Sequence, residues 1–288
     1  MIQDIFPMKL SNEYRKKTPE KDSKILGFGD RTIYLSYEKE IQFLTYEQWK
    51  NYNIEVLKEK MPPCVYLFCL DGEDYFLTDI KEDTKIDGFA FHKMFDVRTM
   101  QPKEKVLVAA TAWHLFVWYR DNQFCGRCAK PLVHSDTQRM MQCPVCGNMV
   151  FPKIAPAVIV AVTNGDKILM TKYAGREYKR YALIAGFTEI GETAEETVKR
   201  EVMEEVGLKV KNIRYYKSQP WGFDSNLLLG YFCELEEEEE IHLDEQELSV
   251  AEWVDYRDIP DYGENLSLTH EMMMIFRGGV DEKNRYKV

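Results

Sequence analysis

The chain has 288 residues, of which 45% are hydrophobic and 30% charged, and its formal net charge is −10. Such a composition is typical of folded globular proteins, and this length suffices for two modest domains or one large one. No apolar run reaches the roughly 18 residues that a membrane span requires, and the first residues lack the order of a signal peptide. We therefore expect a cytoplasmic protein with no membrane partner. The acidic balance argues against a broad nucleic-acid groove, although a bound metal can reverse the charge locally for a small phosphate-bearing substrate.

Residues 25–120 show a mixed α/β pattern. Two strands joined by a turn are expected where CVYLFCL, starting at Cys64, is followed by DGED and YFLTDI. A long, mostly apolar helix is expected over residues 104–122. This part contains no motif that we can connect to chemistry. We predict an N-terminal mixed α/β domain at residues 1–120.

Four cysteines follow in two close pairs. Cys125, Cys128, Cys143 and Cys146 are spaced as C-x2-C, fourteen residues, C-x2-C. Four thiolates at this spacing form the closed tetrahedral shell that Zn²⁺ prefers. A closed shell leaves no position for substrate or water, so we predict one structural Zn²⁺ per chain in a zinc ribbon at residues 121–152. Because a zinc ribbon can also bind nucleic acid, a nucleotide-sensing regulator that binds nucleic acid through this ribbon stays open as a non-enzymatic alternative.

The remaining residues, 153–288, are expected to form a second α+β unit. Its expected elements are two strands around the Asn-Gly turn in APAVIVAVTNGDKILMTKY, a helix at Thr193–Val206, strands at 213–217 and 227–233, and a closing helix at 268–276. Thr193 and Glu196 form a capping box at the start of the first of these helices, and Gly207 is placed to end it. The predicted fold class of the whole chain is α+β.

Three glutamates lie beside the apolar stripe of that helix. Glu201, Glu204 and Glu205 occupy an adjoining arc, with Glu201 and Glu205 one turn apart. Crowded carboxylates repel one another and take up protons unless a divalent cation neutralises them. Ligands that offer only oxygen favour Mg²⁺ or Mn²⁺. A solvated acidic helix is the alternative interpretation for a glutamate-rich pattern of this kind.

The segment GFTEIGETAEETVKREVMEEVGL resembles the Nudix box, G-x5-E-x7-R-E-U-x-E-E-x-G-U, where U is aliphatic. The fixed positions are filled by Gly186, Glu192, Arg200, Glu201, Val202, Glu204, Glu205, Gly207 and Leu208. Resemblance to Nudix hydrolases implies an α/β/α sandwich with a mixed sheet. It also implies cleavage of a nucleoside diphosphate linked to another group, with metal ions neutralising the charge that develops on the phosphate.

The resemblance further implies a role for each site residue. Glu201 and Glu205 are the expected metal ligands together with Glu204, and Arg200 and Glu192 are expected to orient them. The backbone carbonyl of Ala185, just before the box, is a further expected metal contact. Glu247 in DEQELSVAEW is our candidate for an additional ligand or for the general base that activates water. For Glu247, a surface glutamate on a strand edge is the alternative.

A zinc ribbon before the box and an S-Q-P-W stretch after it resemble the NADH pyrophosphatase subfamily, whose loop reads S-Q-P-W-P-F-P-x-S. Gly222 and Asp224 replace the two later prolines here, and Asn226 replaces the final serine. Because proline restricts the backbone, its loss is expected to loosen this loop. We predict that SQPWGFDSN lies over the substrate cleft; the alternative is that its aromatic residues fill the core. The substrate-binding candidates are Phe151, Phe187, Gln219, Pro220, Trp221, Gly222, Phe223, Asp224, Ser225, Asn226, Thr269 and Arg98.

The subfamily resemblance implies Mg²⁺-dependent hydrolysis of the diphosphate of NAD(H) to NMN(H) and AMP. It also implies NAD-capped RNA 5′ ends as a larger substrate, and a homodimer. The alternative within enzymes is a Nudix diphosphatase for ADP-ribose or another dinucleotide.

Overall fold

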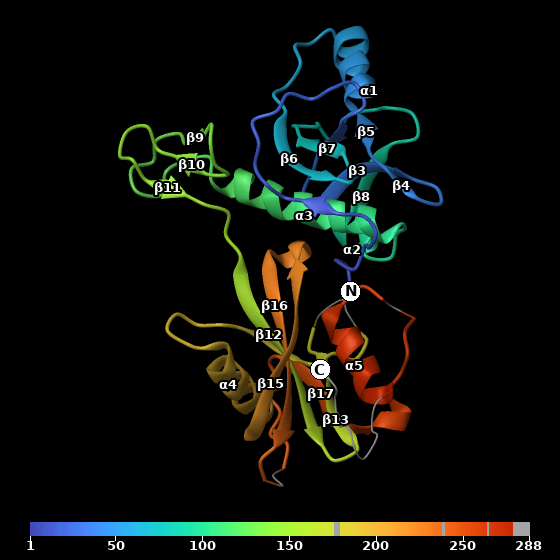
Figure 1. The fold of residues 1–288 in the computed structure, drawn as a ribbon, viewed down its shortest axis with the longest axis vertical. Coiled ribbons are helices and arrows are strands. Elements are labelled where there is room, and N and C mark those ends of the chain that lie inside the picture. The colour runs from blue at the N-terminus through green and yellow to red at the C-terminus, as the bar shows by residue number, and fades with distance from the viewer. Residues whose placement is uncertain (176–178, 238–239, 264, 279–288) are drawn as a thin grey trace. The chain divides into compact units, whose positions relative to one another are not determined.

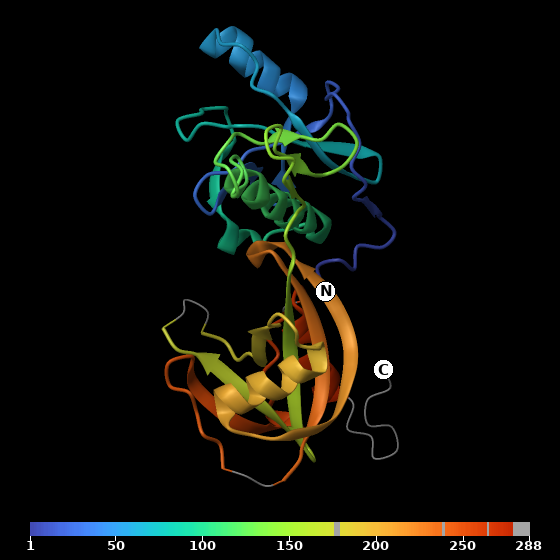
Figure 2. The same cartoon turned by 90° about the vertical axis from the view of Figure 1, so that its left-hand side faces the viewer.

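A computed structural model of the chain describes residues 1–175, 179–237, 240–263 and 265–278 (Figures 1 and 2). The chain forms two compact units. The N-terminal unit comprises Ile2–Lys153 and Gly222–Ser225, and the C-terminal unit comprises Met1, Ile154–Trp221 and Asn226–Val288. The predicted domain boundaries at residues 121 and 153 stay predictions. None of the helices in the described ranges is long and apolar enough to cross a membrane.

The N-terminal unit has a mixed α/β fold, as predicted. A five-stranded sheet has the order β1-β6-β7-β2-β5, and a three-stranded sheet has the order β4-β3-β8. The strands are β1 (Leu10–Ser11), β2 (Lys24–Leu26), β3 (Thr32–Tyr37), β4 (Ile41–Gln42), β5 (Leu44–Thr45), β6 (Val65–Leu70), β7 (Glu73–Leu77) and β8 (Ala90–Lys93). The helices are α1 (Tyr46–Asn51), its π-helical continuation η1 (Tyr52–Leu57), α2 (Met94–Val97) and α3 (Lys103–Asp121). The predicted strand pair is therefore confirmed as β6 and β7, and the predicted long helix as α3.

The zinc-ribbon segment forms a small antiparallel sheet at the end of α3. Its strands are β9 (Val133–His134), β10 (Met141–Gln142) and β11 (Met149–Val150), in the order β11-β10-β9. Cys125, Leu132 and Cys143 are its buried apolar centre. Three side chains cannot exclude enough water to stabilise a fold of this size, so a metal or another cross-link is needed.

The C-terminal unit is built on one mixed sheet with a helix on each face. Its strands are β12 (Ala155–Asn164), β13 (Lys167–Tyr173), β14 (Ile184–Phe187), β15 (Val210–Trp221), β16 (Asn226–Leu235) and β17 (Leu248–Asp255). The order is β15-β16-β12-β13-β17, with β14 paired to β12; β12 and β16 run parallel, and the other pairs are antiparallel. The helices are α4 (Ala194–Val206), α5 (Leu268–Gly278) and the short 3-10 helix η3 (Tyr256–Asp258).

The period of two along the strands assigns one face of this sheet to each helix (Figure 1). Leu229, Tyr231 and Cys233 of β16 belong to the core that includes Val198, Val202 and Val206 of α4. Gly230 points the other way, where an added Cβ would lie 2.9 Å from Met272 Sδ of α5. The predicted α/β/α sandwich with a mixed sheet is therefore confirmed.

The ends of α4 are those that the sequence predicts. The Thr193 side chain accepts a hydrogen bond from the Glu196 amide, and the Glu196 side chain accepts one from the Thr193 amide. Gly207 ends the helix at φ 69°, in the left-handed region that favours glycine.

The stretch expected as a loop is mostly strand, so that prediction is wrong. Ser218–Trp221 continues β15 and pairs with Leu229–Asn226 of β16, and a 3-10 turn, η2 (Gly222–Asp224), joins the two strands. Pro220 is tolerated because β15 is an edge strand, where a missing N–H interrupts no ladder. The two strands are thus longer than the predicted 213–217 and 227–233.

Candidate active site and zinc centre

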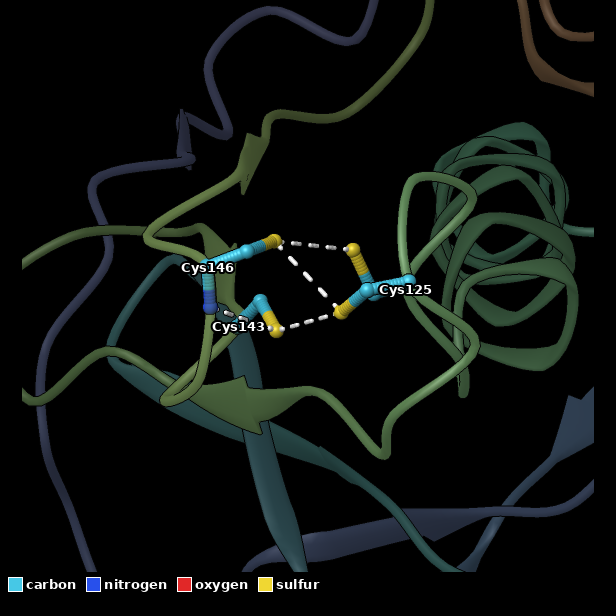
Figure 3. Close-up of side chains that lie close together, drawn as sticks. Cys125, Cys143 and Cys146 are labelled. Atoms are coloured by element: carbon cyan, nitrogen blue, oxygen red, sulfur yellow. Dashed lines mark hydrogen bonds between the residues drawn. The ribbon is translucent and has the colours of Figure 1, made fainter.

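The four cysteines converge on one point, and Figure 3 shows Cys125 on a loop that faces Cys143 and Cys146. Sγ of Cys125 lies 3.6 Å from that of Cys146, and Sγ of Cys128 lies 3.5 Å from those of Cys143 and Cys146. Four sulfurs bound to one tetrahedral Zn²⁺ at about 2.3 Å lie about 3.8 Å apart. The four thiols therefore fit a zinc ion with a small expansion, and among the described residues they are the single group of three or more metal-ligating side chains gathered this closely.

Both cysteine pairs have the same backbone arrangement. The Ala129 amide donates to the Cys125 carbonyl at 2.8 Å, and the Gly147 amide donates to the Cys143 carbonyl at 3.0 Å. The Arg127 amide also donates to Cys125 Sγ at 3.4 Å, and the Cys146 amide donates to Cys143 Sγ at 3.5 Å. The latter hydrogen bond lowers the pKa of Cys143, because it stabilises the thiolate. The residue after each pair has a left-handed backbone: Ala129 at φ 57° and Gly147 at φ 71°.

We expect Ala129→Gly to stabilise the ribbon. An L-residue in the left-handed region costs roughly 1–2 kcal/mol, which glycine avoids, while glycine loses up to about 1 kcal/mol through its more flexible unfolded state. The expected gain is a few tenths to about 1 kcal/mol in the free energy of unfolding, measured by denaturant titration with zinc present. Gly147→Ala is the matched control and should be destabilised. A less stable Ala129→Gly variant would contradict this reading of the loop.

Arg200 organises the carboxylates of the box. Its Nε and Nη2 donate to the two carboxylate oxygens of Glu192 at 2.6 and 2.9 Å, a two-point ion pair. Its Nη1 donates to Glu201 at 2.8 Å and to Glu204 at 2.9 Å. The hydrogen bond from Arg200 is the main cause that lowers the pKa of Glu192 to about 2. The predicted orienting role of Arg200 and Glu192 stays a prediction, and these contacts support it.

Glu201 is buried against β14. It is 8% exposed, and burial raises its pKa, with Arg200 opposing the shift and the charges of Glu204 and Glu247 adding to it. Gly186 makes this position possible, because a Cβ there would lie 1.8 Å from Glu201 Cδ. The glycine of the box is therefore required for space.

Glu205 and Ala185 adjoin, along α4 and β14 respectively, the two residues that are in contact, Glu201 and Gly186. Glu205 is one turn beyond Glu201 on α4 and is 3% exposed. Ala185 precedes Gly186 in β14 and pairs with Ile159 of β12. Glu204 is exposed and reaches this group through Arg200. The contact between Glu201 and Gly186 joins α4 to β14, and metal binding by Glu201, Glu204, Glu205 and the Ala185 carbonyl stays a prediction.

Glu247 approaches the box from another part of the chain. It stands just before β17, its backbone carbonyl accepts a hydrogen bond from the Ala174 amide at 2.9 Å, and its charge contributes to the raised pKa of Glu201. Its side chain is exposed. The structure places this carboxylate within electrostatic reach of the site, and its role as ligand or base stays a prediction.

We expect Gly186→Ala to disable the site by displacing Glu201. The added methyl group overlaps a carboxylate, so Glu201 must move, and kcat/KM should fall at least about 100-fold, since displacing a catalytic group by about 1 Å has effects of this size. The melting temperature should change by a few degrees only. Gly278→Ala is the control, because an added Cβ there meets nothing within 4 Å. Unchanged activity in Gly186→Ala would contradict the assigned geometry.

Gln219 is fully buried and its amide is used by the backbone before α5. Its Nε2 donates to the Leu266 carbonyl and its Oε1 accepts from the Leu268 amide, both at 2.8 Å. Trp221 is buried as well, whereas Pro220 is exposed. In this conformation Gln219 fixes the segment that leads into α5; substrate binding by Gln219 and Trp221 stays a prediction.

The turn at 222–225 packs within the N-terminal unit. Trp113 Nε1 donates to the Phe223 carbonyl at 3.2 Å, and a Cβ at Gly222 would lie 2.2 Å from the Ala110 carbonyl oxygen. Gly222 therefore fits where a proline ring would overlap the backbone of α3. This packing opposes a loosening of the turn, and the expectation that the loss of proline loosens the stretch stays a prediction.

The other substrate-binding candidates occupy varied positions. Phe151 and Phe187 are 53% and 55% exposed, as stacking rings require. Arg98 ends α2, with its guanidinium 5.9 Å from the Phe223 ring centroid. Thr269 is half-buried in the first turn of α5. Asp224 is exposed, Ser225 has φ 60°, and Asn226 begins β16.

Sequence reasoning missed Thr197. This buried threonine donates its hydroxyl to Glu192 Oε2 at 2.9 Å, on the side of the carboxylate that Arg200 also contacts. Its position three residues before Arg200 on one helix face was the available signal.

Comparison with known proteins agrees with these sites. Residues 153–275 match the family described as NUDIX domain, and residues 120–151 match the NADH pyrophosphatase zinc ribbon domain. Proteins named NAD-capped RNA hydrolase NudC from Salmonella typhimurium and Citrobacter koseri are 40% identical over 171 residues, which cover 59% of this chain and 66% of each relative. The chain thus matches slightly less than two thirds of the length of these relatives. The chain is also similar to a NUDIX hydrolase from Nitrosomonas europaea whose crystal structure is known. The sequence identity is 21% and the TM-score is 0.46, and the similarity covers 54% of this chain and 90% of that one. The intact box and the four-cysteine cluster agree with both family matches, and the chain carries a NUDIX domain preceded by an NADH pyrophosphatase zinc ribbon domain.

Proposed function

We propose that the chain hydrolyses the diphosphate of NAD(H) to NMN(H) and AMP, and that it removes NAD caps from RNA 5′ ends. The observation that carries this proposal is the pairing of an NADH pyrophosphatase zinc ribbon with a NUDIX domain in which Glu201 lies against Gly186 and shares Arg200 with Glu192 and Glu204. The names of the 40%-identical relatives support the RNA substrate.

The proposed catalytic metal is Mg²⁺ or Mn²⁺. Glu201, Glu204 and Glu205 offer oxygen ligands alone, the donor type that these ions prefer. Two of the three carboxylates are buried, and a single guanidinium contacts Glu192, Glu201 and Glu204. Negative charge therefore remains in excess around Arg200, and a divalent cation fits this excess. The proposed ligands are these three glutamates with Glu247 and the Ala185 carbonyl.

The residues of the chain then have separable roles in the proposed reaction. The bound metal supplies stabilisation of the negative charge that develops on the phosphate oxygens. Arg200 keeps Glu201 and Glu204 in place through its hydrogen bonds. Glu247, whose exposed carboxylate acts electrostatically on Glu201, is proposed to accept a proton from the attacking water. Phe187 and Phe151 offer exposed rings for a flat base or nicotinamide.

We also propose a homodimer, which rests on the subfamily resemblance, and a cytoplasmic location, which rests on the order of the first residues. Light scattering of the purified protein tests the dimer directly: a mass of two chains supports it, and a mass of one chain contradicts it.

A substrate panel tests the proposed activity. Turnover of NADH, NAD⁺, ADP-ribose and a NAD-capped RNA should be compared at equal Mg²⁺, with an EDTA control. We expect NAD(H) or the capped RNA to have the highest kcat/KM. A much higher kcat/KM for ADP-ribose would replace this proposal by the alternative Nudix diphosphatase.

A further inference from the structure

One short segment concentrates positive charge and aromatic rings in an otherwise acidic chain. Residues 172–181, KYAGREYKRY, contain four Lys or Arg, three Tyr and one Glu, against a net charge of −10 for the chain. Residues 176–178 lie outside the described residues. We call the described side chains Lys172, Lys179, Arg180 and Tyr181, together with Tyr262, the basic strip.

The basic strip adjoins the glutamate site through the sheet. Tyr173 pairs with Leu248, the residue after Glu247, and the Ala174 amide donates to the Glu247 carbonyl at 2.9 Å. On the other side, Ala182 forms a bridge with Thr171. Ala182 is followed by β14, which carries Gly186 against Glu201. The strip is thus flanked by both backbone segments that reach the catalytic carboxylates.

Cations and rings of the strip are interleaved. Lys172 Nζ lies 4.1 Å from the Tyr181 ring centroid, and the Arg180 guanidinium lies 4.9 Å from the Tyr262 ring centroid. The Tyr181 amide donates to the Tyr262 hydroxyl at 3.3 Å, which joins the two pairs.

Two acidic groups beside the strip, Glu252 and Asp261, are already engaged. Glu252 accepts a hydrogen bond from the Tyr181 hydroxyl, and this bond raises the pKa of Tyr181 to about 12. Asp261 lies 3.8 Å from Arg277 and 3.5 Å from His270. Within the described residues, the cations Lys172, Lys179 and Arg180 form no ion pair, and Lys179 and Arg180 are exposed. Unpaired cations beside aromatic rings are the chemistry with which proteins bind single-stranded nucleic acid.

We propose that the basic strip binds the first nucleotides of the RNA strand in a NAD-capped RNA. This inference rests on the proposed function. The diphosphate of the cap goes to the glutamate site, so phosphates that follow the adenosine exist in the RNA substrate alone. Lys172, Lys179 and Arg180 neutralise those phosphates, and the rings of Tyr181 and Tyr262 stack on bases. Free NAD(H) lacks these phosphates, so the strip favours capped RNA over the free dinucleotide.

The test measures how a variant that lacks the three positive charges acts on two substrates. The variant combines Lys172→Gln, Lys179→Gln and Arg180→Gln. Its kcat/KM is measured for NADH and for a NAD-capped RNA of about 20 nucleotides. Each phosphate of a single strand that the protein neutralises adds about 0.7 to the slope with which log affinity falls against log salt concentration. With three such phosphates, log kcat/KM for the RNA should fall more steeply with log salt in the wild type than in the variant, by about 2 in slope. At about 50 mM salt the variant should therefore lose roughly tenfold or more on the capped RNA, while NADH changes less than twofold.

A matched control removes equal charge elsewhere in the same unit. Lys167, Lys209 and Lys211 lie at the opposite end of the strands, where Thr163 pairs with both Ile168 and Glu234. Their combined Gln variant should retain activity on both substrates. Equal loss on NADH and RNA in the Lys172/Lys179/Arg180 variant, or no loss on RNA, overturns the inference. A wild type that cleaves NADH but not capped RNA also overturns it and leaves the diphosphatase proposal intact; cleavage of neither substrate overturns the proposed function itself.

Discussion

Glu205→Gln is expected to lower kcat/KM for NADH at least about 1,000-fold with little change in stability. The substitution keeps the size of a side chain that is 3% exposed but removes its charge. A metal ligand that stabilises a charged transition state contributes several kcal/mol, and about 4 kcal/mol corresponds to this factor. Glu201→Gln should behave alike. Steady-state kinetics at saturating Mg²⁺ and thermal melting provide the two measurements.

The control for this prediction lies on the same helix. Glu195 is an exposed glutamate in the first turn of α4, outside the predicted ligand set. Its Gln variant should keep activity within about threefold. Near-normal turnover of both Glu201→Gln and Glu205→Gln would remove the metal assignment.

Cys143→Ser is expected to release zinc and unfold the ribbon. Cys143 is 1% exposed, and the ribbon buries few apolar side chains besides its cysteines. Binding of a structural Zn²⁺ contributes about 10–16 kcal/mol to folding in zinc-finger peptides, so loss of one ligand outweighs the stability of a small segment. Elemental analysis should find one zinc per chain in the wild type and far less in the variant, and Cys125→Ser should have the same effect.

Two other cysteines serve as controls, because replacing them shows whether zinc is lost through a missing ligand or through the loss of any cysteine. Cys64 and Cys69 lie outside the four-cysteine cluster, so Cys64→Ser and Cys69→Ser should retain one zinc per chain. A stable wild type without zinc after careful purification would contradict the centre.

The elements of the site that follow from local pattern were predictable. The capping box of Thr193 and Glu196 and the glycine at 207 set both ends of α4, and short-range chemistry of this kind is visible in sequence. The cysteine spacing likewise fixed the ribbon, because each pair must turn two thiolates to one point.

Features that depend on distant parts of the chain were not predictable. In the sequence, Pro220 predicts the end of a strand. It is compatible with β15 because β15 is an edge strand, which is a property of the whole sheet. In the sequence, Gly222 indicates a loosened turn. In the structure it packs against the carbonyl of Ala110, which lies more than a hundred residues earlier in the chain. The box indicated that Arg200 orients carboxylates. Its hydrogen bonds to Glu192, Glu201 and Glu204 depend on how the loop before α4 folds back onto the helix, which the pattern does not specify.

The identity of the products tests the central claim most directly. NADH incubated with the purified protein and Mg²⁺ should yield equal amounts of NMNH and AMP, separated by chromatography and identified by mass, because the diphosphate bond is the one broken. Release of dihydronicotinamide with ADP-ribose, or no product under conditions in which the zinc centre is full, would contradict it.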